Sequence, residues 1–161
     1  MANSLMVREH RADPTELVHL PQPVDLRELR EQDLDAAAEA YWLSHHGSSS
    51  QMTIEEATAD VRAAWQGEYG LWLPDASLGA WRGDELLGAV LTVRDAPWDD
   101  APPGPFIVDL FVIPSARRQG IARALVTAAV GAVRESVALR VDDTAPAARA
   151  LYLHLGFREV G

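Results

Sequence analysis

The feature that most constrains the fold of this chain is a nearly continuous apolar run from Phe106 to Ile113. It predicts a β-strand buried on both faces, because a strand with one face in water alternates apolar and polar residues. Pro114 ends this strand, since proline has no backbone N–H for the sheet ladder. An amphipathic helix is expected to follow over residues 119–135. Strand, turn and helix in this order favour a fold of the α/β class.

The rest of the pattern completes a mixed α/β domain. Further strands are expected over residues 24–29, 77–81, 86–93, 137–141 and 157–160, and further helices from Asp33, from the capping residue Thr53 and over residues 146–155. This order predicts a mixed sheet in one domain over residues 23–161, a length that a single core can fill. Residues 1–22 contain repeated prolines and are expected to form an extended or loosely ordered lead-in.

Charge and composition exclude several classes of function. The chain has 24 acidic residues against 14 lysines and arginines, and its formal net charge of −10 argues against nucleic acid or an anionic membrane as a partner. No apolar run approaches the roughly 18 residues of a membrane span, and no signal peptide is recognised, so we expect a cytoplasmic protein. The absence of cysteine excludes disulfides, a thiolate zinc site and a cysteine nucleophile.

The turn after the buried strand has the features of an anion site. Gly120 has no Cβ, so the backbone there can approach a ligand closely, and Ala122 adds little bulk. Free amides over residues 119–123 point out of the helix start, where the helix dipole favours negative charge. The turn matches neither Gly-x-x-x-x-Gly-Lys nor Gly-x-Gly-x-x-Gly. The alternative is a plain strand-to-helix connection with solvated arginines. Three arginines lie in the turn: Arg117, Arg118 and Arg123.

A second motif runs from Ala148 to Phe157. Its expected helix places Leu151, Tyr152 and Leu155 on one apolar face. A tyrosine in such a stripe is commonly a core residue, and this alternative stays open when the motif is taken alone.

Together the two motifs resemble the GNAT superfamily of acetyl-CoA-dependent N-acyltransferases. The resemblance spans residues 106–157 in order and spacing, and the upstream elements from about residue 24 fit as well. It implies a single-domain fold with a central, mixed, twisted sheet that is splayed at the cofactor strand and has helices on both faces. It rests on four elements: Val112-Ile113-Pro114, Arg117-Arg118-Gln119-Gly120-Ile121-Ala122, the strand 137–141, and Ala148 to Phe157.

The resemblance also implies how acetyl-CoA would be bound. The diphosphate would be held by amides of Gln119, Gly120, Ile121, Ala122 and Arg123, with Arg117, Arg118 or Arg123 near the phosphates. The strand Leu110-Phe111-Val112 would part from its neighbour and pair with the pantetheine arm, since a parted strand exposes unpaired N–H and C=O groups. An amide near Leu110 would polarise the acetyl carbonyl.

For catalysis, the resemblance makes Tyr152 the acid that protonates the departing thiolate. Asp109 lies inside the apolar strand, where an unpaired carboxylate is costly, and would serve as the base, directly or through water. Alternatively, Asp109 faces solvent at a strand end or is paired structurally. No metal is expected, because His45 and His46 lack a spaced set of further ligands. These two histidines are either acceptor-site groups or solvated loop residues.

The chain departs from the family pattern in places. An asparagine usual in relatives is replaced by Ala145, so its cofactor contact is lost unless Asp142, Asp143 or Thr144 substitutes for it. Ala122 stands for the second glycine of the turn, a variant that the family tolerates. Because the sequence stops soon after the Gly-Phe motif, the usual last strand is expected to be incomplete or contributed by a partner.

The leading expectation is an N-acetyltransferase that moves the acetyl group of acetyl-CoA to a primary amine, with a small-molecule amine favoured. An enzyme for peptide amines (protein N-termini or lysines) and a catalytically silent acyl-CoA-binding regulatory module are the alternatives. The loops 41–52 and 95–105 would select the acceptor, with Trp98, Asp99 and Asp100 opposite Tyr41 and Trp42, although Trp42 is favoured as a core residue. A homodimer is common in the family.

Overall fold

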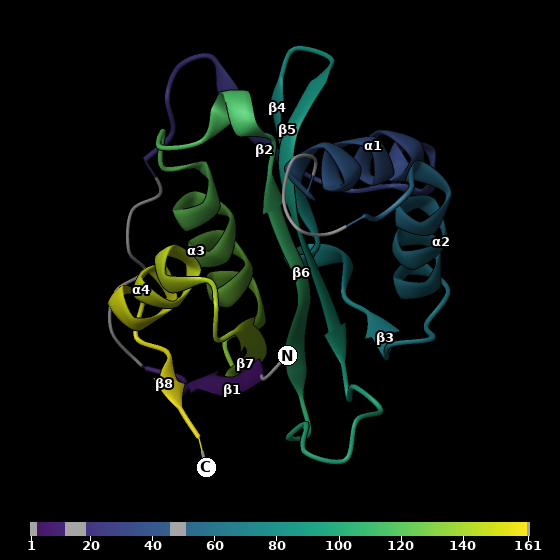
Figure 1. Cartoon of the computed structure of the whole chain (residues 1–161). Helices are drawn as coiled ribbons and strands as arrows, with labels where there is room; N and C mark the ends of the chain where they lie inside the picture. Colours follow the sequence, from purple (N-terminus) through teal and green to yellow (C-terminus); the bar gives the residue numbers. More distant parts are fainter. Residues whose placement is uncertain (1–2, 12–18, 46–50, 161) are drawn as a thin grey trace.

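In the computed structural model, which describes residues 3–11, 19–45 and 51–160, the chain folds around one mixed β-sheet (Figure 1). The strands are β1 (Asn3–Arg8), β2 (Val24–Glu28), β3 (Leu71–Trp72), β4 (Leu78–Arg82), β5 (Glu85–Arg94), β6 (Pro105–Val112), β7 (Val137–Asp142) and β8 (Arg158–Glu159). The helices are α1 (Leu34–His45), α2 (Ile54–Trp65), α3 (Ile121–Val133) and α4 (Pro146–His154). The expected mixed α/β fold is confirmed.

The strands lie in the order β2-β4-β5-β6-β7-β1-β8, and β3 pairs with β5 outside this path. Only β6 and β7 run parallel among the paired strands of the described chain, and the other pairs are antiparallel. Strand β3 was not predicted, because two residues are too few to show a period of alternation.

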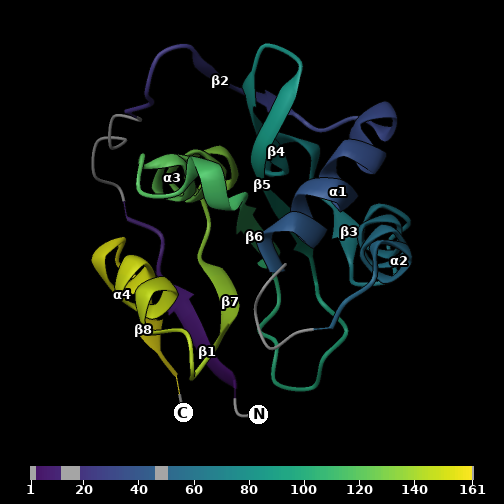
Figure 2. The same cartoon turned by 45° about the horizontal axis from the view of Figure 1, so that its top comes forward.

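Helices cover both faces of the sheet, with α1 and α2 on one side and α3 and α4 on the other (Figures 1 and 2). Each helix buries its apolar stripe, as Leu34 does in α1 and Leu125 does in α3. The predicted cap of α2 is present, because the Thr53 hydroxyl accepts a hydrogen bond from the Glu56 amide at 3.1 Å. No helix in the described part of the chain has the length and apolar character needed to cross a membrane.

The N-terminal segment differs from the lead-in expected over residues 1–22. Residues Asn3–Arg8 form strand β1, which pairs with β7 along six residues and with β8 on its other side. The side chain of Met6 is fully buried in the core, while Leu5 and Val7 pack on the opposite face. The outer edge of β7 is therefore covered by the same chain, and the last strand, β8, is only two residues long. Strand β1 has six residues and one buried side chain, so its alternation of apolar and polar residues is too short to distinguish it from a loop.

We expect Met6→Ala to lower the free energy of unfolding by about 2–4 kcal/mol, because it removes a fully buried side chain from a strand inside the sheet. The matched control is Leu153→Ala on α4, whose side chain is 41% exposed and whose loss is expected to cost about 0.5 kcal/mol. Urea unfolding of the two variants measures the difference. Equal effects would mean that β1 does not stabilise the sheet.

Candidate active site

Strand β6 separates from β7 halfway along its length, as Figure 2 shows. On one side, β6 pairs with β5 from Pro105 to Val112. On the other side, its pairing with β7 stops after Phe106 with Ala138 and Ile107 with Leu139. The β7-facing edge of residues 110–112 is therefore not used by the sheet, and the predicted splay is confirmed. This edge offers backbone donors and acceptors to an extended ligand.

A β-bulge marks the point of separation. Leu91 pairs with Asp109 and the next residue, Thr92, pairs with Ile107, so Val108 is an extra residue in β6. Bulges bend a strand and increase its local twist, which explains why β6 leaves β7 here. On the β5 side, Gly88 allows close contact, because a Cβ at that position would lie 2.5 Å from the Phe111 carbonyl oxygen.

The turn after β6 leads into an open helix start. Gly120 is the N-cap of α3 and has a φ of 81°, in the left-handed region that favours glycine. The first hydrogen bond of the helix runs from the Ala124 amide to the Gly120 carbonyl, so the amides of the preceding turn point outward. A Cβ at Gly120 would have the His19 carbonyl oxygen, 4.0 Å away, as its nearest neighbour. This geometry fits a diphosphate held by amides at a helix N-terminus.

The arginines of the turn point to different places. The Arg117 guanidinium donates hydrogen bonds to the Ser44 carbonyl at 2.7 Å and to the Val112 carbonyl at 3.4 Å. It thus ties the end of α1 to the end of β6. Arg118 and Arg123 are exposed on the turn and on the first turn of α3. Their predicted role beside the phosphates stays a prediction.

The two predicted catalytic residues come together where β6 leaves β7. Asp109 lies in β6, and burial raises the pKa of its carboxyl well above the ordinary value. Tyr152 lies on the buried face of α4, and burial together with the charge of Asp109 raises the pKa of its phenol to about 12. The Tyr152 ring packs edge-on against Phe157, with the ring centroids 5.7 Å apart. The Tyr152 phenol and the Asp109 carboxyl therefore both keep their protons to a higher pH than they would in water, and their catalytic roles stay predictions.

A cluster of tyrosines and carboxylates extends this site toward α1 and α2. The Tyr69 hydroxyl donates a hydrogen bond to Asp60 at 2.6 Å, and burial together with the negative charges of Asp109 and Asp60 raises the pKa of Tyr41. Sequence reasoning missed Asp60 and Tyr69. The available signal was an acidic residue beside the apolar stripe of α2, one residue before the buried Val61.

Comparison with known families agrees with this geometry. Residues 34–157 match the model of the family described as "Acetyltransferase (GNAT) family". The chain belongs to the GNAT family. A comparison with curated protein sequences gives no significant match.

Solved structures share the GNAT fold at low sequence identity. PH1933 from Pyrococcus horikoshii OT3 has a TM-score of 0.72 and 19% identity, covering 86% of this chain and 90% of its own. An aminoglycoside N-acetyltransferase, AAC(6')-Iy, in complex with CoA has a TM-score of 0.63 and 20% identity, covering 90% of this chain and 94% of its own. A GCN5-related N-acetyltransferase from Sphaerobacter thermophilus has a TM-score of 0.69 and 20% identity, and the match covers 98% of this chain but 48% of that one.

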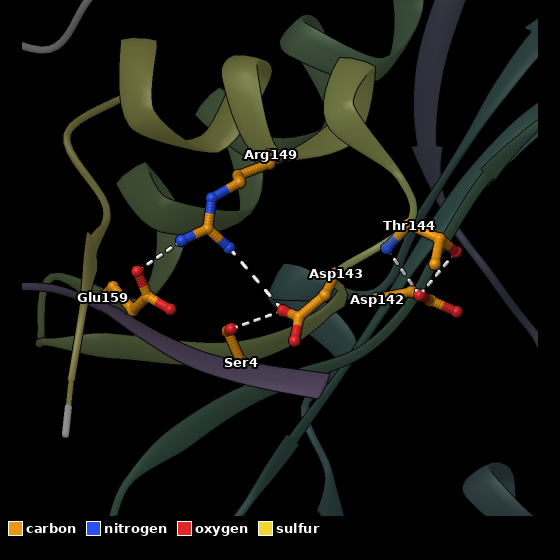
Figure 3. Close-up of polar contacts among 6 residues, drawn as sticks. All are labelled: Ser4, Asp142, Asp143, Thr144, Arg149 and Glu159. Atoms are coloured by element: carbon orange, nitrogen blue, oxygen red, sulfur yellow. Dashed lines mark hydrogen bonds and ion pairs between the residues drawn. The ribbon is translucent and has the colours of Figure 1, made fainter. Parts of the chain in front are cut away.

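The loop that carries the GNAT asparagine position is held by its own side chains (Figure 3). The Asp142 carboxylate accepts hydrogen bonds from the amide and the hydroxyl of Thr144, at 2.8 and 2.7 Å. These bonds lower the pKa of Asp142. Ala145 is the N-cap of α4 and has no side chain that caps the helix. Asp142 and Thr144 thus shape the loop, and their replacement of the asparagine contact stays a prediction.

The same loop joins the strands at this edge of the sheet. The Ser4 hydroxyl of β1 donates to Asp143 at 2.5 Å, and Asp143 pairs with Arg149 of α4 at 3.8 Å. Arg149 also pairs with Glu159 of β8 (Figure 3). Asp143 therefore links the N-terminal strand to α4.

The loop between β5 and β6 is packed beside the tyrosine cluster. The Trp98 ring lies 5.9 Å from Tyr69 and 5.4 Å from Phe106, with the Arg140 guanidinium 5.0 Å away over its face. Asp100 pairs with the same Arg140. Trp98 thus stacks on the Tyr69 ring, and its predicted place at an acceptor entrance stays a prediction.

Trp42 and His45, both singled out in the acceptor segment, lie in α1. The Trp42 indole donates a hydrogen bond to the Met52 carbonyl at 3.1 Å, which fits its favoured role as a packing residue. Burial and the charge of Arg117 lower the pKa of His45, whose ring lies 4.9 Å from that of Tyr41. His46 lies outside the described residues. Within the described ranges, no three His, Cys, Asp or Glu side chains are grouped to hold a metal ion.

Proposed function

We propose that this GNAT protein transfers the acetyl group of acetyl-CoA to a primary amine by direct attack of the amine. One observation carries the proposal: β6 leaves β7 beside Asp109 and Tyr152 and then leads into the open helix start at Gly120. Asp109, the free backbone edge of residues 110–112 and the anion site at Gly120 thus follow one another along a single segment, and Tyr152 of α4 joins this site from another part of the chain. This order suits acetyl-CoA, a long molecule that has its diphosphate toward one end and its reactive thioester at the other.

The residues that would hold acetyl-CoA fit its two ends. The outward amides of residues 119–123 would bind the diphosphate, and the free edge of Leu110, Phe111 and Val112 would pair with the pantetheine arm. Acetyl-CoA supplies an activated acyl group as its thioester. The amide of Leu110 would donate to the acetyl oxygen, where negative charge develops.

The chain's own side chains would move the protons. A primary ammonium must lose a proton before its nitrogen can attack, and Asp109 would accept that proton. As the new C–N bond forms and the C–S bond breaks, Tyr152 would donate its hydroxyl proton to the leaving thiolate. No cysteine is present to form a covalent enzyme intermediate, and direct attack requires none.

A small amine is the favoured acceptor. The charge of −10 and the acidic Asp99 and Asp100 beside Trp98 favour a cationic molecule. One structurally similar protein is an aminoglycoside N-acetyltransferase, so aminoglycosides belong among the acceptors to be tried. Acetylation of protein N-termini or lysines is the alternative.

The test is release of free thiol from acetyl-CoA with a panel of polyamines, aminoglycosides, amino acids and peptides. We expect release with at least one small amine, and mass spectrometry of that amine should show one added acetyl group. Release with peptides alone would favour the protein-directed alternative. Measurable CoA binding without release would favour a regulatory acyl-CoA-binding module, and the absence of CoA binding would overturn the proposal.

A further inference from the structure

The side chain of Arg117 connects the end of helix α1 with the end of strand β6. Its Nε atom donates a hydrogen bond to the Val112 carbonyl at 3.4 Å, and its Nη2 atom donates one to the Ser44 carbonyl at 2.7 Å. These two nitrogens lie on one edge of the planar guanidinium, so a single side chain binds both carbonyls at the same time. The reaction steps described above use neither bond.

The Val112 carbonyl lies on the edge of β6 that the sheet leaves unused. The amide of the next residue, Ile113, donates to the Leu87 carbonyl of β5 at 2.8 Å, so Ile113 faces β5. Backbone groups of successive residues in an extended chain point to opposite edges, and those of Val112 therefore face away from β5. This is the edge proposed above for the pantetheine arm. Arg117 thus holds the end of the segment along which the acyl carrier would lie.

The Ser44 carbonyl belongs to the last turn of α1, where helix carbonyls have no partner within the helix. A cation beside these carbonyls is also favoured by the helix dipole. The Ser44 hydroxyl donates to the Tyr41 carbonyl of the same turn at 2.6 Å. Arg117 therefore acts as a C-terminal cap that comes from outside the helix, and it fixes this turn to β6.

This turn of α1 packs against β6 beside the proposed base. The ring of Tyr41 stacks on that of Phe111, with the ring centroids 5.1 Å apart. Phe111 and Asp109 are two residues apart in β6, so their side chains point to the same face of the sheet. The end of α1 therefore lies on the face where Asp109 would take the proton of the amine.

We propose that Arg117 is a positioning residue for the acceptor, because it holds the last turn of α1 against the pantetheine edge of β6; this inference rests on the proposed function. The role differs from the phosphate contact that the sequence predicts for Arg117. The guanidinium edge that binds the two carbonyls is one that could otherwise bind two phosphate oxygens. A carbonyl oxygen has two lone pairs, so Val112 can accept from Arg117 and from an amide of pantetheine together.

The experiment measures acetyl transfer to the best acceptor by the wild type, Arg117→Gln and Arg117→Lys. Lysine keeps the charge but lacks the planar pair of donors. Both variants are expected to lower kcat/KM for the amine about 10-fold, because the acceptor side of the site is no longer held in place. The Kd of CoA should change less than about 3-fold in both. A phosphate ligand would show the opposite pattern, with CoA affinity reduced in Arg117→Gln and largely kept in Arg117→Lys.

An acyl donor without phosphates separates the two roles further. Acetylpantetheine has the thioester and the pantetheine arm and lacks the diphosphate. The ratio of the wild-type rate to the Arg117→Gln rate is expected to be about 10 with this donor, as with acetyl-CoA, since the two changes act at independent places. A ratio near 1 with acetylpantetheine beside a ratio of about 10 with acetyl-CoA would overturn the proposal and make Arg117 a phosphate ligand.

The matched control is Arg134→Gln, which removes the same charge from an exposed position at the other end of α3 and should leave the amine kinetics unchanged. Thermal unfolding checks that the variants are folded, and Arg117→Lys supplies the comparison if Arg117→Gln is not. Unchanged kcat/KM for the amine in folded Arg117 variants would overturn the role of Arg117 alone, as would a loss of CoA affinity equal to the loss of kcat/KM. A wild type that acetylates no acceptor would overturn the proposed function, and this inference with it.

Discussion

Replacing Gly120 by leucine is expected to weaken CoA binding about 100-fold. The new side chain would project into the open space at the start of α3, where the nearest neighbour of a Cβ is 4.0 Å away. It would keep the diphosphate away from the amides of residues 119–123. Hydrogen bonds to a charged group contribute about 1.5–3 kcal/mol each, and the loss of one such bond corresponds to a change in Kd of about 10- to 150-fold. Titration calorimetry of both proteins with CoA measures this change in Kd.

The variant must be separated from a general loss of stability, because Gly120 has a φ of 81° and leucine is strained there. Gly83, in the β4–β5 hairpin, has a φ of 61° and is equally open around its Cβ. Gly83→Leu should therefore lower the free energy of unfolding by a similar amount, about 1–2 kcal/mol, and leave CoA binding unchanged. A Gly120→Leu protein that binds CoA as the wild type does would refute the diphosphate site.

The fold was predictable where a regular pattern of apolar residues extends over several turns of a helix or over most residues of a strand. Strand β6 and helix α3 carry long apolar patterns with proline and glycine at the boundary, and both lie where expected. Strand β1 was not recognised, because its place depends on β7, more than 120 residues away along the chain. Pairing over such a distance leaves no local signal in six residues. The expectation of a lead-in over residues 1–22 failed there for that reason.

Asp109 could be singled out because a carboxylate inside an apolar run requires an explanation. The bulge at Val108 and the neighbours of Asp109 could not, since the bulge depends on the register of β6 with β5 and the neighbours come from other elements of the fold. Asp60 and Tyr69 look like ordinary polar residues of a helix and the segment after it. Their hydrogen bond depends on how the chain turns back along α2 after the helix ends, where the Glu68 amide bonds to the Ala63 carbonyl.

Tyr152→Phe is expected to lower kcat about 100- to 1,000-fold and to leave CoA affinity unchanged, since the hydroxyl is needed only when the thiolate leaves. With its pKa raised to about 12, the phenol stays protonated at neutral pH until then. The charge of Asp109 is one cause of that raised pKa. When Asp109 takes the proton of the amine, this charge disappears and the pKa of Tyr152 falls. Tyr152 thus becomes a stronger acid at the stage when the thiolate needs a proton.

The hydroxyl can be tested apart from the packing of the ring. Phe157 is fully buried against Tyr152, and Phe157→Leu should lower the free energy of unfolding by about 1–1.5 kcal/mol while kcat falls less than about 10-fold. Tyr152→Phe should show the reverse, a large loss of kcat with little loss of stability, because the ring contact is kept. Steady-state kinetics, CoA titration and urea unfolding of both variants supply the comparison. If Tyr152→Phe lost no more activity than Phe157→Leu, another group would have to protonate the thiolate, and the role of Tyr152 would be limited to packing.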